Sequence, residues 1–494
     1  MGTSAFPFDN TFSQLPERFY ARLAPTPVSS PRLVRLNDTL ARQLCLDPVH
    51  LKDTNGVEVF AGNCVPDRAD PLAMTYAGFQ FGSWNPQLGD GRAILLGELV
   101  DCDGQRRDVQ LKGAGRTPFS RMGDGRAGLG PVLREYIVSE AMAALDIPTT
   151  RSLAAVLTGE RVIRESSLPG AVLTRVASSH IRIGTFQYFA ARRDTEALAL
   201  LADYVIRRHY PNLAARDQPY LALLSAVIER QAALVAQWQL IGFIHGVMNT
   251  DNMSIAAETI DYGPCAFMDT YHPETVYSSI DHMGRYAYQN QPPIAHWNLA
   301  GLAQALLPLL SENEDEAVEK ATAAINAFPD HFKVIYTAGL GRKLGLSTVE
   351  AGDEVLGSDL LERMARNKAD FTLTFRYLSA LSQTYTDADN KVRALFEDPA
   401  EFDQWAVDWR ERLKQDNVAD NKRQDQMHKS NPIYIPRNHL VEAAIRAAED
   451  GDDPAPFDEL VTVLASPYLQ QPGAEAYAEP PRPDQVVQQT YCGT

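Results

Sequence analysis

The segment from His245 to Gly263, HGVMNTDNMSIAAETIDYG, limits the folds open to this chain more than any other segment. It follows a long apolar helix and brings Asp251, Asn252 and Asp261 into one loop and hairpin. Two carboxylates and a carboxamide are hard oxygen ligands that suit a phosphate-bound Mg²⁺, with substrate oxygens and water completing the shell. The segment therefore predicts the metal and base half of a nucleotidyl or phosphoryl transfer site. The alternative is an Asp- and Asn-rich turn whose side chains bond only their own backbone.

The same segment resembles the catalytic loop of protein kinases, with one departure. Kinases carry H-R-D-x-x-x-x-N and then D-F-G, in which the first Asp is the base and the Asn and second Asp hold metal. Here His245 and Asn252 take the outer positions, and Val247 stands where the base belongs. Asp251 is the carboxylate of this octapeptide that could replace the base. The tripeptide DYG, beginning at Asp261, fits the D-F-G position.

Charge and composition argue against several classes of protein. The 494 residues carry a formal net charge of -17, which argues against binding to nucleic acid or to an anionic membrane surface. The N-terminal sequence lacks a basic start and an apolar core, so it does not predict a signal peptide. No uninterrupted apolar run reaches the roughly 18 residues of a spanning helix. We therefore expect a soluble, cytoplasmic protein.

The five cysteines predict neither a disulfide framework nor a zinc site, because they are scattered and form no C-x-x-C pair. Most of them are expected to be small buried apolar residues. Cys492 differs because it lies near the end of the sequence, in QQTYCGT, where we expect exposure and where a reactive redox thiol is an open alternative. The cysteines are Cys45, Cys64, Cys102, Cys265 and Cys492.

Patterns along the chain predict four parts. A Pro-rich N-terminal extension contains a short helix that begins after Asn37 or Asp38. A part with short alternating apolar runs and clustered Gly and Arg comes next, a mostly helical part follows, and the tail looks mostly extended. The expected bounds are 1–65, 66–190, 191–450 and 451–494.

Two elements of the second part predict a Lys–Glu pair. Residues 83–101 read as a hairpin with Gly89, Asp90 and Gly91 at its turn. In the next strand apolar and polar residues alternate, so Lys112 projects from the face opposite the core. In the helix that follows, Pro131 suits the first position and Glu135 the first turn. Kinases use this order for the ion pair that orients a phosphate-binding Lys. The alternative is a surface Lys and a Glu favoured by the helix dipole.

Glycine and arginine residues predict phosphate contacts. The run GDGRAG, from Gly123 to Gly128, lacks the preceding buried strand and the later acidic residue of a Rossmann fingerprint. With Arg116, Arg121 and Arg126 nearby, it is better interpreted as a loop whose amides cradle phosphate oxygens, or otherwise as a mobile surface loop. Two further arginines lie among apolar neighbours and need either a carboxylate or a phosphate partner, since a buried unpaired guanidinium is costly. They are Arg175 and Arg182.

Motifs over nearly the whole chain resemble the selenoprotein O family of pseudokinase-like adenylyltransferases. They are GDGRAILLGELVD, LKGAGRTPFSRMGDGRAGLG, LREYIVSEAM, HGVMNTDNM, IDYGPCAFMD and NPIYIPRNHLVEAAI. The resemblance implies an α+β, protein-kinase-like two-lobed fold with a mixed β/α N-lobe and a mostly α-helical C-lobe. It also implies transfer of AMP from ATP to Ser, Thr or Tyr hydroxyls of proteins, with release of pyrophosphate. The alternatives are a protein phosphotransferase and an inactive nucleotide-binding scaffold.

The resemblance also implies roles for individual residues. Phosphates are contacted by Lys112, Arg175 and Arg182, with Glu135 orienting Lys112, while Gly89, Gly91, Arg92, Asp124 and Gly125 line the nucleotide. Asn252 and Asp261 hold Mg²⁺ or Mn²⁺, and Asp251 is the general base. Cys492 stands where the family often carries Cys or selenocysteine, and Cys265 is a candidate redox partner for it.

Overall fold

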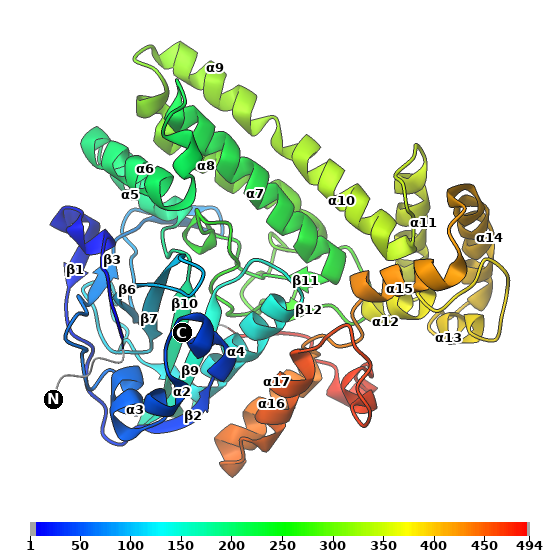
Figure 1. Ribbon diagram of the computed structural model, residues 1–494, viewed down its shortest axis with the longest axis horizontal. Coiled ribbons are helices and arrows are strands. Elements are labelled where there is room, and N and C mark those ends of the chain that lie inside the picture. The colour runs from blue at the N-terminus through cyan, green and yellow to red at the C-terminus, as the bar shows by residue number, and fades with distance from the viewer. Residues whose placement is uncertain (1–5, 492–494) are drawn as a thin grey trace.

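An antiparallel sheet of eight strands forms the framework on which the site is built (Figure 1). The computed structural model describes residues 6–491. The strand order is β1-β3-β6-β7-β10-β9-β2, and the short β8 pairs with β10. The strands are β1 Tyr20–Arg22, β2 Arg32–Leu36, β3 Leu72–Met74, β6 Ala93–Val100, β7 Arg106–Lys112, β8 Ala127–Gly128, β9 Arg151–Ile163 and β10 Ser167–Ala177.

The two faces of this sheet bury different sets of residues. On one face Val109 and Leu111 pack into a core with residues of three short helices, α1 (Asp38–Gln43), α2 (Pro48–Leu51) and α3 (Thr54–Ala61). The long helix α4 (Leu129–Ala144) packs against β9 and β10, and α16 (Asn438–Gly451) and α17 (Ala455–Leu464) pack on α4. Because side chains alternate along a strand, Gln110 and Lys112 of β7 lie on the face opposite Val109 and Leu111, as the sequence predicted.

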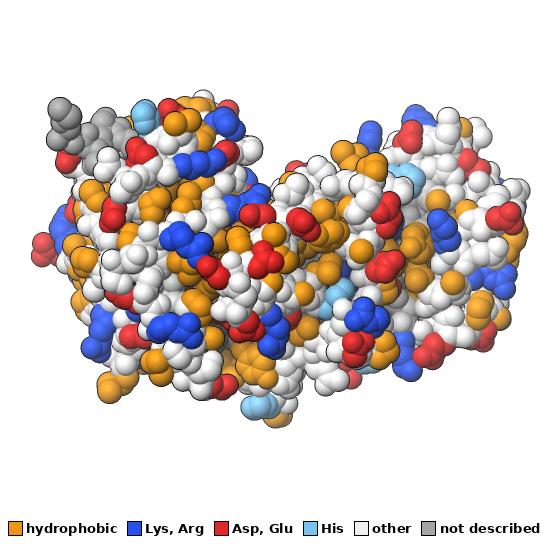
Figure 2. Space-filling view, turned by 90° about the horizontal axis from the view of Figure 1, so that it is seen from below, with side chains coloured by type: hydrophobic (Ala, Val, Ile, Leu, Met, Phe, Trp, Pro, Cys, Tyr) orange, Lys and Arg blue, Asp and Glu red, His pale blue; other side chains and the backbone are white. Residues whose placement is uncertain are grey.

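Helices dominate the chain from residue 195 onward, as the sequence predicted. They surround two apolar cores, and in Figure 1 α11 to α15 lie at one end of the molecule. In Figure 2 this end is the smaller body at the right, and acidic and basic side chains are interspersed over the face shown. The helices are α5 Ile183–Ala191, α6 Thr195–His209, α7 Pro219–Ile241, α8 Gln291–Leu310, α9 Glu314–Ile325, α10 Phe328–Leu344, α11 Asp353–Arg366, α12 Phe371–Leu378, α13 Asp389–Arg393, α14 Pro399–Asp416 and α15 Asp420–Ser430.

Helix α7 is the one helix among residues 6–491 that is long and apolar enough to cross a membrane, with a mean hydropathy of 1.2. Half of this apolar stretch is buried inside the fold, where α7 packs against α8 and α10. The core helix of a soluble protein has the same character, so this length and composition are weak evidence for a membrane span.

The two ends of the chain are more structured than the sequence suggested. Within residues 1–65, β1 and β2 join the main sheet by pairing with β3 and β9. Helix α1 begins as expected, because the Asn37 side chain accepts a hydrogen bond from the Leu40 amide. The expectation of a mostly extended tail was wrong for α17, which buries Phe457 and Leu460 against α4.

Two local predictions in the second part of the chain were also wrong. The strand at 93–100 is present, but its partners are β3 and β7, and β5 (Ser83–Asn85) pairs instead with β4 (Gly78–Gln80). Helix α4 begins two residues before Pro131, so Glu135 lies in its second turn. The helix still presents Glu135 to the sheet face that carries Lys112.

The cysteine prediction was wrong for one pair. Cys45 and Cys102 form a disulfide with a Cα–Cα distance of 5.4 Å, although neither is buried. The bond joins the end of α1 to the turn between β6 and β7. The sequence carried no signal for it, because 57 residues separate the two cysteines.

Candidate functional site

The residues assigned to nucleotide, metal and base contacts line a single cavity of about 1040 Å³. The sheet supplies one wall and the loop that follows α7 supplies another. Segments far apart in the sequence thus meet around one space large enough for a nucleotide. The predicted residues that line it are Gly89, Gly91, Arg92, Lys112, Asp124, Gly125, Arg175, Arg182, Asp251, Asn252 and Asp261.

Strand register places Lys112 and Arg175 side by side. Leu173 of β10 lies opposite Lys112 of β7, and Arg175 lies two residues further along the same face. Glu135 of α4 accepts from both cations, at 2.5 Å from Lys112 Nζ and 2.5 Å from Arg175 Nη2. The predicted Lys–Glu pair therefore forms, and the carboxylate fixes a second cation as well. Glu135 itself is buried behind this pair.

Asp261 is the acceptor on which the cations converge. Its Oδ1 lies 2.9 Å from Arg175 Nη2 and 3.7 Å from Lys112 Nζ, and its Oδ2 accepts from Arg182. Arg182 also donates to the Asp251 carbonyl oxygen at 2.7 Å, and its guanidinium lies 4.8 Å from the Tyr76 ring centre. The carboxylate partners that buried arginines require are therefore present, while both guanidinium groups still line the cavity.

The charges of this cluster determine its protonation. Burial by itself raises the pKa of Asp261, but the charges of Arg182, Arg175 and Lys112 outweigh it and hold that pKa well below its ordinary value. Burial lowers the pKa of Lys112, and the carboxylates of Glu135 and Asp261 oppose this shift. Asp261 is therefore ionised at neutral pH.

Asp251 lies in a different electrostatic environment. Burial raises the pKa of Asp251 to about 6, against the lowering effect of a hydrogen bond from Gln80. Gln80 Nε2 donates to Asp251 Oδ2 at 3.0 Å, and Oδ1 has no hydrogen-bond partner within the described part of the chain. A carboxylate with a pKa near neutrality and a free oxygen is suited to accept a proton. This role of Gln80 could not be predicted from the sequence, because 171 residues separate it from Asp251.

Asn252 offers an oxygen beside these carboxylates. Its Nδ2 donates to the Val247 carbonyl oxygen at 2.9 Å, which leaves Oδ1 available. Among residues 6–491 no group of three His, Cys, Asp or Glu side chains could hold a metal ion. A divalent ion here would therefore have to draw further ligands from substrate phosphates and water, as Mg²⁺ usually does. Asn252 and Asp261 fit an ion held in that way.

The glycine-arginine loop lines part of the cavity. Gly125 has φ +72°, and a Cβ there would lie 2.1 Å from the Gly115 carbonyl oxygen, so only glycine fits. Asp124 pairs with Arg164 at 2.9 Å and accepts from the Arg126 amide at 2.9 Å. Arg164 also lines the cavity, and no motif in the sequence pointed to it.

The three arginines proposed for this loop differ in position. Arg121 and Arg126 line the cavity, whereas Arg116 is not among its lining residues. Arg126 also donates to the carbonyl oxygens of Thr26 and Pro27, both at 3.0 Å. The loop is therefore tied to the N-terminal segment rather than detached on the surface.

Two other candidates lie outside the cavity lining. His245 Nε2 lies 2.8 Å from the Ile260 carbonyl oxygen, so His245 has a structural role and ties the start of the loop to the residue directly before Asp261. Cys265 is buried, and burial raises the pKa of its thiol to about 12, so the thiolate is disfavoured. Cys492 lies outside the described residues.

Comparison with known proteins decides the family. A sequence profile described as "Protein adenylyltransferase SelO" matches residues 3–465. The chain belongs to the SelO family. It is 63% identical over 492 residues to "Protein nucleotidyltransferase YdiU" of Rhodopseudomonas palustris (strain BisB5), and alignment covers 100% of both chains. The protein of the same name from Bradyrhizobium diazoefficiens is also 63% identical over 492 residues, again covering 100% of both. The SelO family is one of nucleotidyltransferases, which agrees with the resemblance in the sequence motifs.

Proposed function

We propose that this SelO-family chain transfers AMP from ATP to Ser, Thr or Tyr hydroxyls of other proteins. The observation that carries the proposal is the convergence of Lys112, Arg175 and Arg182 on Asp261 at the wall of a cavity that Asp251 also lines. Fixed cations stabilise negative charge that develops on phosphate oxygens. The Asp251 carboxylate, whose Oδ1 has no hydrogen-bond partner among the described residues, would serve as the base for an acceptor hydroxyl.

The reaction balances with these groups. The acceptor oxygen bonds to the α-phosphorus of ATP, the bond from that phosphorus to the bridging oxygen of the β-phosphate breaks, and pyrophosphate leaves. The hydroxyl proton passes to the carboxylate of Asp251. A Mg²⁺ or Mn²⁺ ion held by Asn252 and Asp261 would supply positive charge to the phosphates. Arg175 and Arg182 would hold oxygens of the triphosphate, and Glu135 would keep Lys112 and Arg175 in place.

We further propose that the molecule has a protein-kinase-like two-lobed architecture. The main sheet with α4 would form the N-lobe, and the helices from α6 onward would form the C-lobe. The Lys112–Glu135 pair and the DYG tripeptide at Asp261 support this architecture, because kinases carry a Lys–Glu ion pair and a D-F-G tripeptide. The kinase base position falls on Val247, whose side chain cannot accept a proton, and this favours Asp251 as the base.

ATP labelled separately at the α- and γ-phosphates tests the proposal against its two alternatives. Purified protein with Mg²⁺ or Mn²⁺ and a mixture of acceptor proteins should transfer the α-label only. Transfer of the γ-label would instead show a phosphotransferase. Binding of ATP with transfer of neither label would show an inactive scaffold. Mass spectrometry of the modified peptides should place AMP on hydroxyl side chains.

A further inference from the structure

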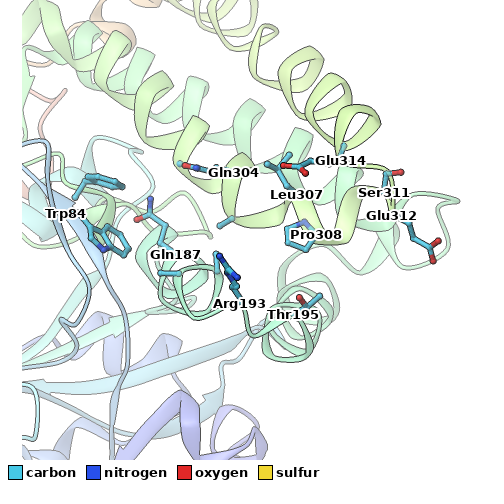
Figure 3. Close-up of a pocket in the computed structure, with 16 residues that line it drawn as sticks. Trp84, Gln187, Arg193, Thr195, Gln304, Leu307, Pro308, Ser311, Glu312 and Glu314 are labelled. Carbon is cyan, nitrogen blue, oxygen red and sulfur yellow. The ribbon is translucent and has the colours of Figure 1, made fainter.

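A second cavity of about 880 Å³ lies beside the candidate site and shares no lining residue with it. Helices α5 and α8 and the start of α9 form three of its sides (Figure 3). The β4–β5 hairpin forms the fourth side through Phe79 and Trp84. The residues proposed for ATP transfer do not use this cavity.

The hairpin is a shared wall between the two cavities. Side chains alternate along β4, so Phe79 faces the second cavity while its neighbour Gln80 faces the first and bonds Asp251. The Phe79 amide donates to the Thr250 hydroxyl at 2.8 Å, which anchors the hairpin to the base loop. A ligand in the second cavity would therefore lie one strand away from the proposed base.

Several polar groups in the second cavity have no partner among the described residues. Gln187 is 5% exposed and lines the cavity, and its Oε1 has no hydrogen-bond partner among residues 6–491. Arg193, Glu312 and Glu314 also line it, and none of them forms an ion pair within the same described range. A buried amide without a partner is costly. A hydrogen bond from a ligand amide N–H to Gln187 Oε1 would offset the free-energy cost of burying that oxygen.

Aromatic side chains give the cavity an apolar end. Phe79 and Trp84 have ring centres 4.9 Å apart, and Trp84 is 38% exposed. The opposite end carries Glu314, the first residue of α9, and Glu312, which precedes the helix and whose side chain points outward in Figure 3. An apolar end, amide groups and an acidic end together match an extended polypeptide segment that carries one apolar and one basic side chain.

We propose that this cavity docks a segment of the acceptor protein. An apolar side chain of the segment packs on Phe79 and Trp84, its backbone bonds Gln187 and Arg193, and a Lys or Arg side chain pairs with the glutamates. The β4–β5 hairpin lies between the docked segment and Asp251, so it would fix the position of the acceptor hydroxyl relative to the base. This inference rests on the proposed adenylyltransferase function, because it names the class of acceptor.

Binding of two synthetic peptides to the full chain tests the docking site. Both are fluorescent, extended sequences with one Tyr and one Leu, and they differ by two Lys or two Glu residues after the Leu. Wild-type protein should bind the Lys peptide about tenfold more tightly than the Glu peptide, and Glu312→Lys/Glu314→Lys should reverse the order. The matched control is Glu229→Lys/Glu319→Lys, which makes the same charge change outside the cavity. It should keep the wild-type order.

A second variant tests the cavity without changing charge. Gln304 is exposed at the cavity, so Gln304→Trp should fill the space without disturbing the core, and it should weaken binding of the Lys peptide. Equal affinity of both peptides for wild-type protein would overturn the proposal. So would binding that neither Glu312→Lys/Glu314→Lys nor Gln304→Trp alters.

Label transfer separates this inference from the proposed function. With α-labelled ATP, Glu312→Lys/Glu314→Lys should raise KM for the Lys peptide while kcat and ATP affinity stay near the wild-type values. If wild-type protein transfers no label to any acceptor, the adenylyltransferase proposal fails, and the peptide affinities still decide whether the cavity docks the segment. If wild-type protein transfers label and both variants keep its KM, the docking proposal fails alone.

Discussion

At the scale of single residues, two aspartates in one cavity are driven to opposite protonation behaviour. Asp261 is held ionised by three cations, whereas burial raises the pKa of Asp251 to about 6. Carboxylates whose environments separate their pKa values are suited to different roles, one as a fixed charge and one as a proton acceptor. The sequence could place both residues in one loop. It could not show their environments, which depend on Arg175, Arg182 and Gln80 from distant segments.

The Asp251 carboxyl should control the acidic limb of the pH–rate profile. A base must be deprotonated to act, so wild-type activity should be present above about pH 6 and be lost as pH falls through that value. Asp251→Asn should lower kcat for AMP transfer by about 10²- to 10⁴-fold and leave ATP affinity nearly unchanged. Initial rates between pH 5 and 8 check this. Wild-type activity in Asp251→Asn would contradict the assignment.

The Gln80 side chain should affect the pH at which the acidic limb of the pH–rate profile occurs. Its hydrogen bond lowers the pKa of Asp251, so Gln80→Leu should move the acidic limb to higher pH while kcat well above the limb is retained. The matched control is Gln87→Leu, whose exposed side chain lies outside the cavity and should leave the limb in place. An identical limb in Gln80→Leu and wild-type protein would show that the hydrogen bond has no such effect.

At the scale of elements, the short β4–β5 hairpin positions the base loop. Its backbone amides at Phe79 and Phe81 donate to Thr250 and Asn249, and its Gln80 side chain donates to Asp251. Such a short hairpin would be marginal alone, so tertiary contacts maintain it. It therefore acts as a brace whose displacement would move Asp251.

Substitution of Gly78 tests this brace. A Cβ at Gly78 would lie 2.6 Å from Asp251 Oδ1, so Gly78→Ala must displace the carboxylate or the hairpin. We expect kcat for AMP transfer to fall by about tenfold or more, since small misplacements of reacting groups are costly. Urea unfolding should change little in comparison. Gly451→Ala is the control, because the nearest atom to its added Cβ would lie 3.9 Å away. A wild-type kcat in Gly78→Ala would show that the hairpin does not position Asp251.

The disulfide is a second link between elements, and it makes a separate prediction. Cys45–Cys102 closes a long loop, so removing it should lower the free energy of unfolding by about 2–4 kcal/mol. Cys45→Ser should show this loss in urea, and a reductant should lower the stability of wild-type protein but not of Cys45→Ser. Cys64→Ser is the control, because Cys64 is a free thiol. If a reductant does not change the stability of wild-type protein, the Cys45–Cys102 disulfide does not stabilise the fold.

Prediction from sequence succeeded where local pattern determines structure. Alternation in β7 predicted the direction of Lys112, and helical spacing predicted α4 and the long helices. It failed where pairing depends on distant partners. Strand β6 pairs with β3 on one side, although β5 lies closer to it in the sequence, and Cys45 forms a disulfide with a residue 57 positions away. The same holds for the candidate site. The motifs named residues that the structure brings together around one cavity, but they did not point to Gln80 or Arg164, which also line it.

At the scale of the whole molecule, helix α10 carries a buried titratable group that has no counter-ion among the described residues. Lys343 of α10 is 4% exposed, its Nζ lies 4.1 Å from the Phe375 ring centre, and no ion pair to it occurs among residues 6–491. Burial lowers the pKa of Lys343 to about 7, whereas the ordinary value is 10.5. The Lys343 amine is therefore protonated less readily in the folded protein than in the unfolded chain, and the free energy of unfolding depends on pH.

The sign of this coupling follows from proton binding. Between about pH 7 and about pH 10 the unfolded chain binds one more proton at this position than the folded protein, so the free energy of unfolding should rise with pH in this window. Lys343→Met should remove that slope, which amounts to about 1.4 kcal/mol per pH unit for one proton. The variant should exceed wild-type stability most at and below pH 7, where the buried ammonium is costliest. Urea unfolding across this range, with exposed Lys422→Met as the control, checks the expectation, and parallel pH curves for Lys343→Met and wild-type protein would refute it.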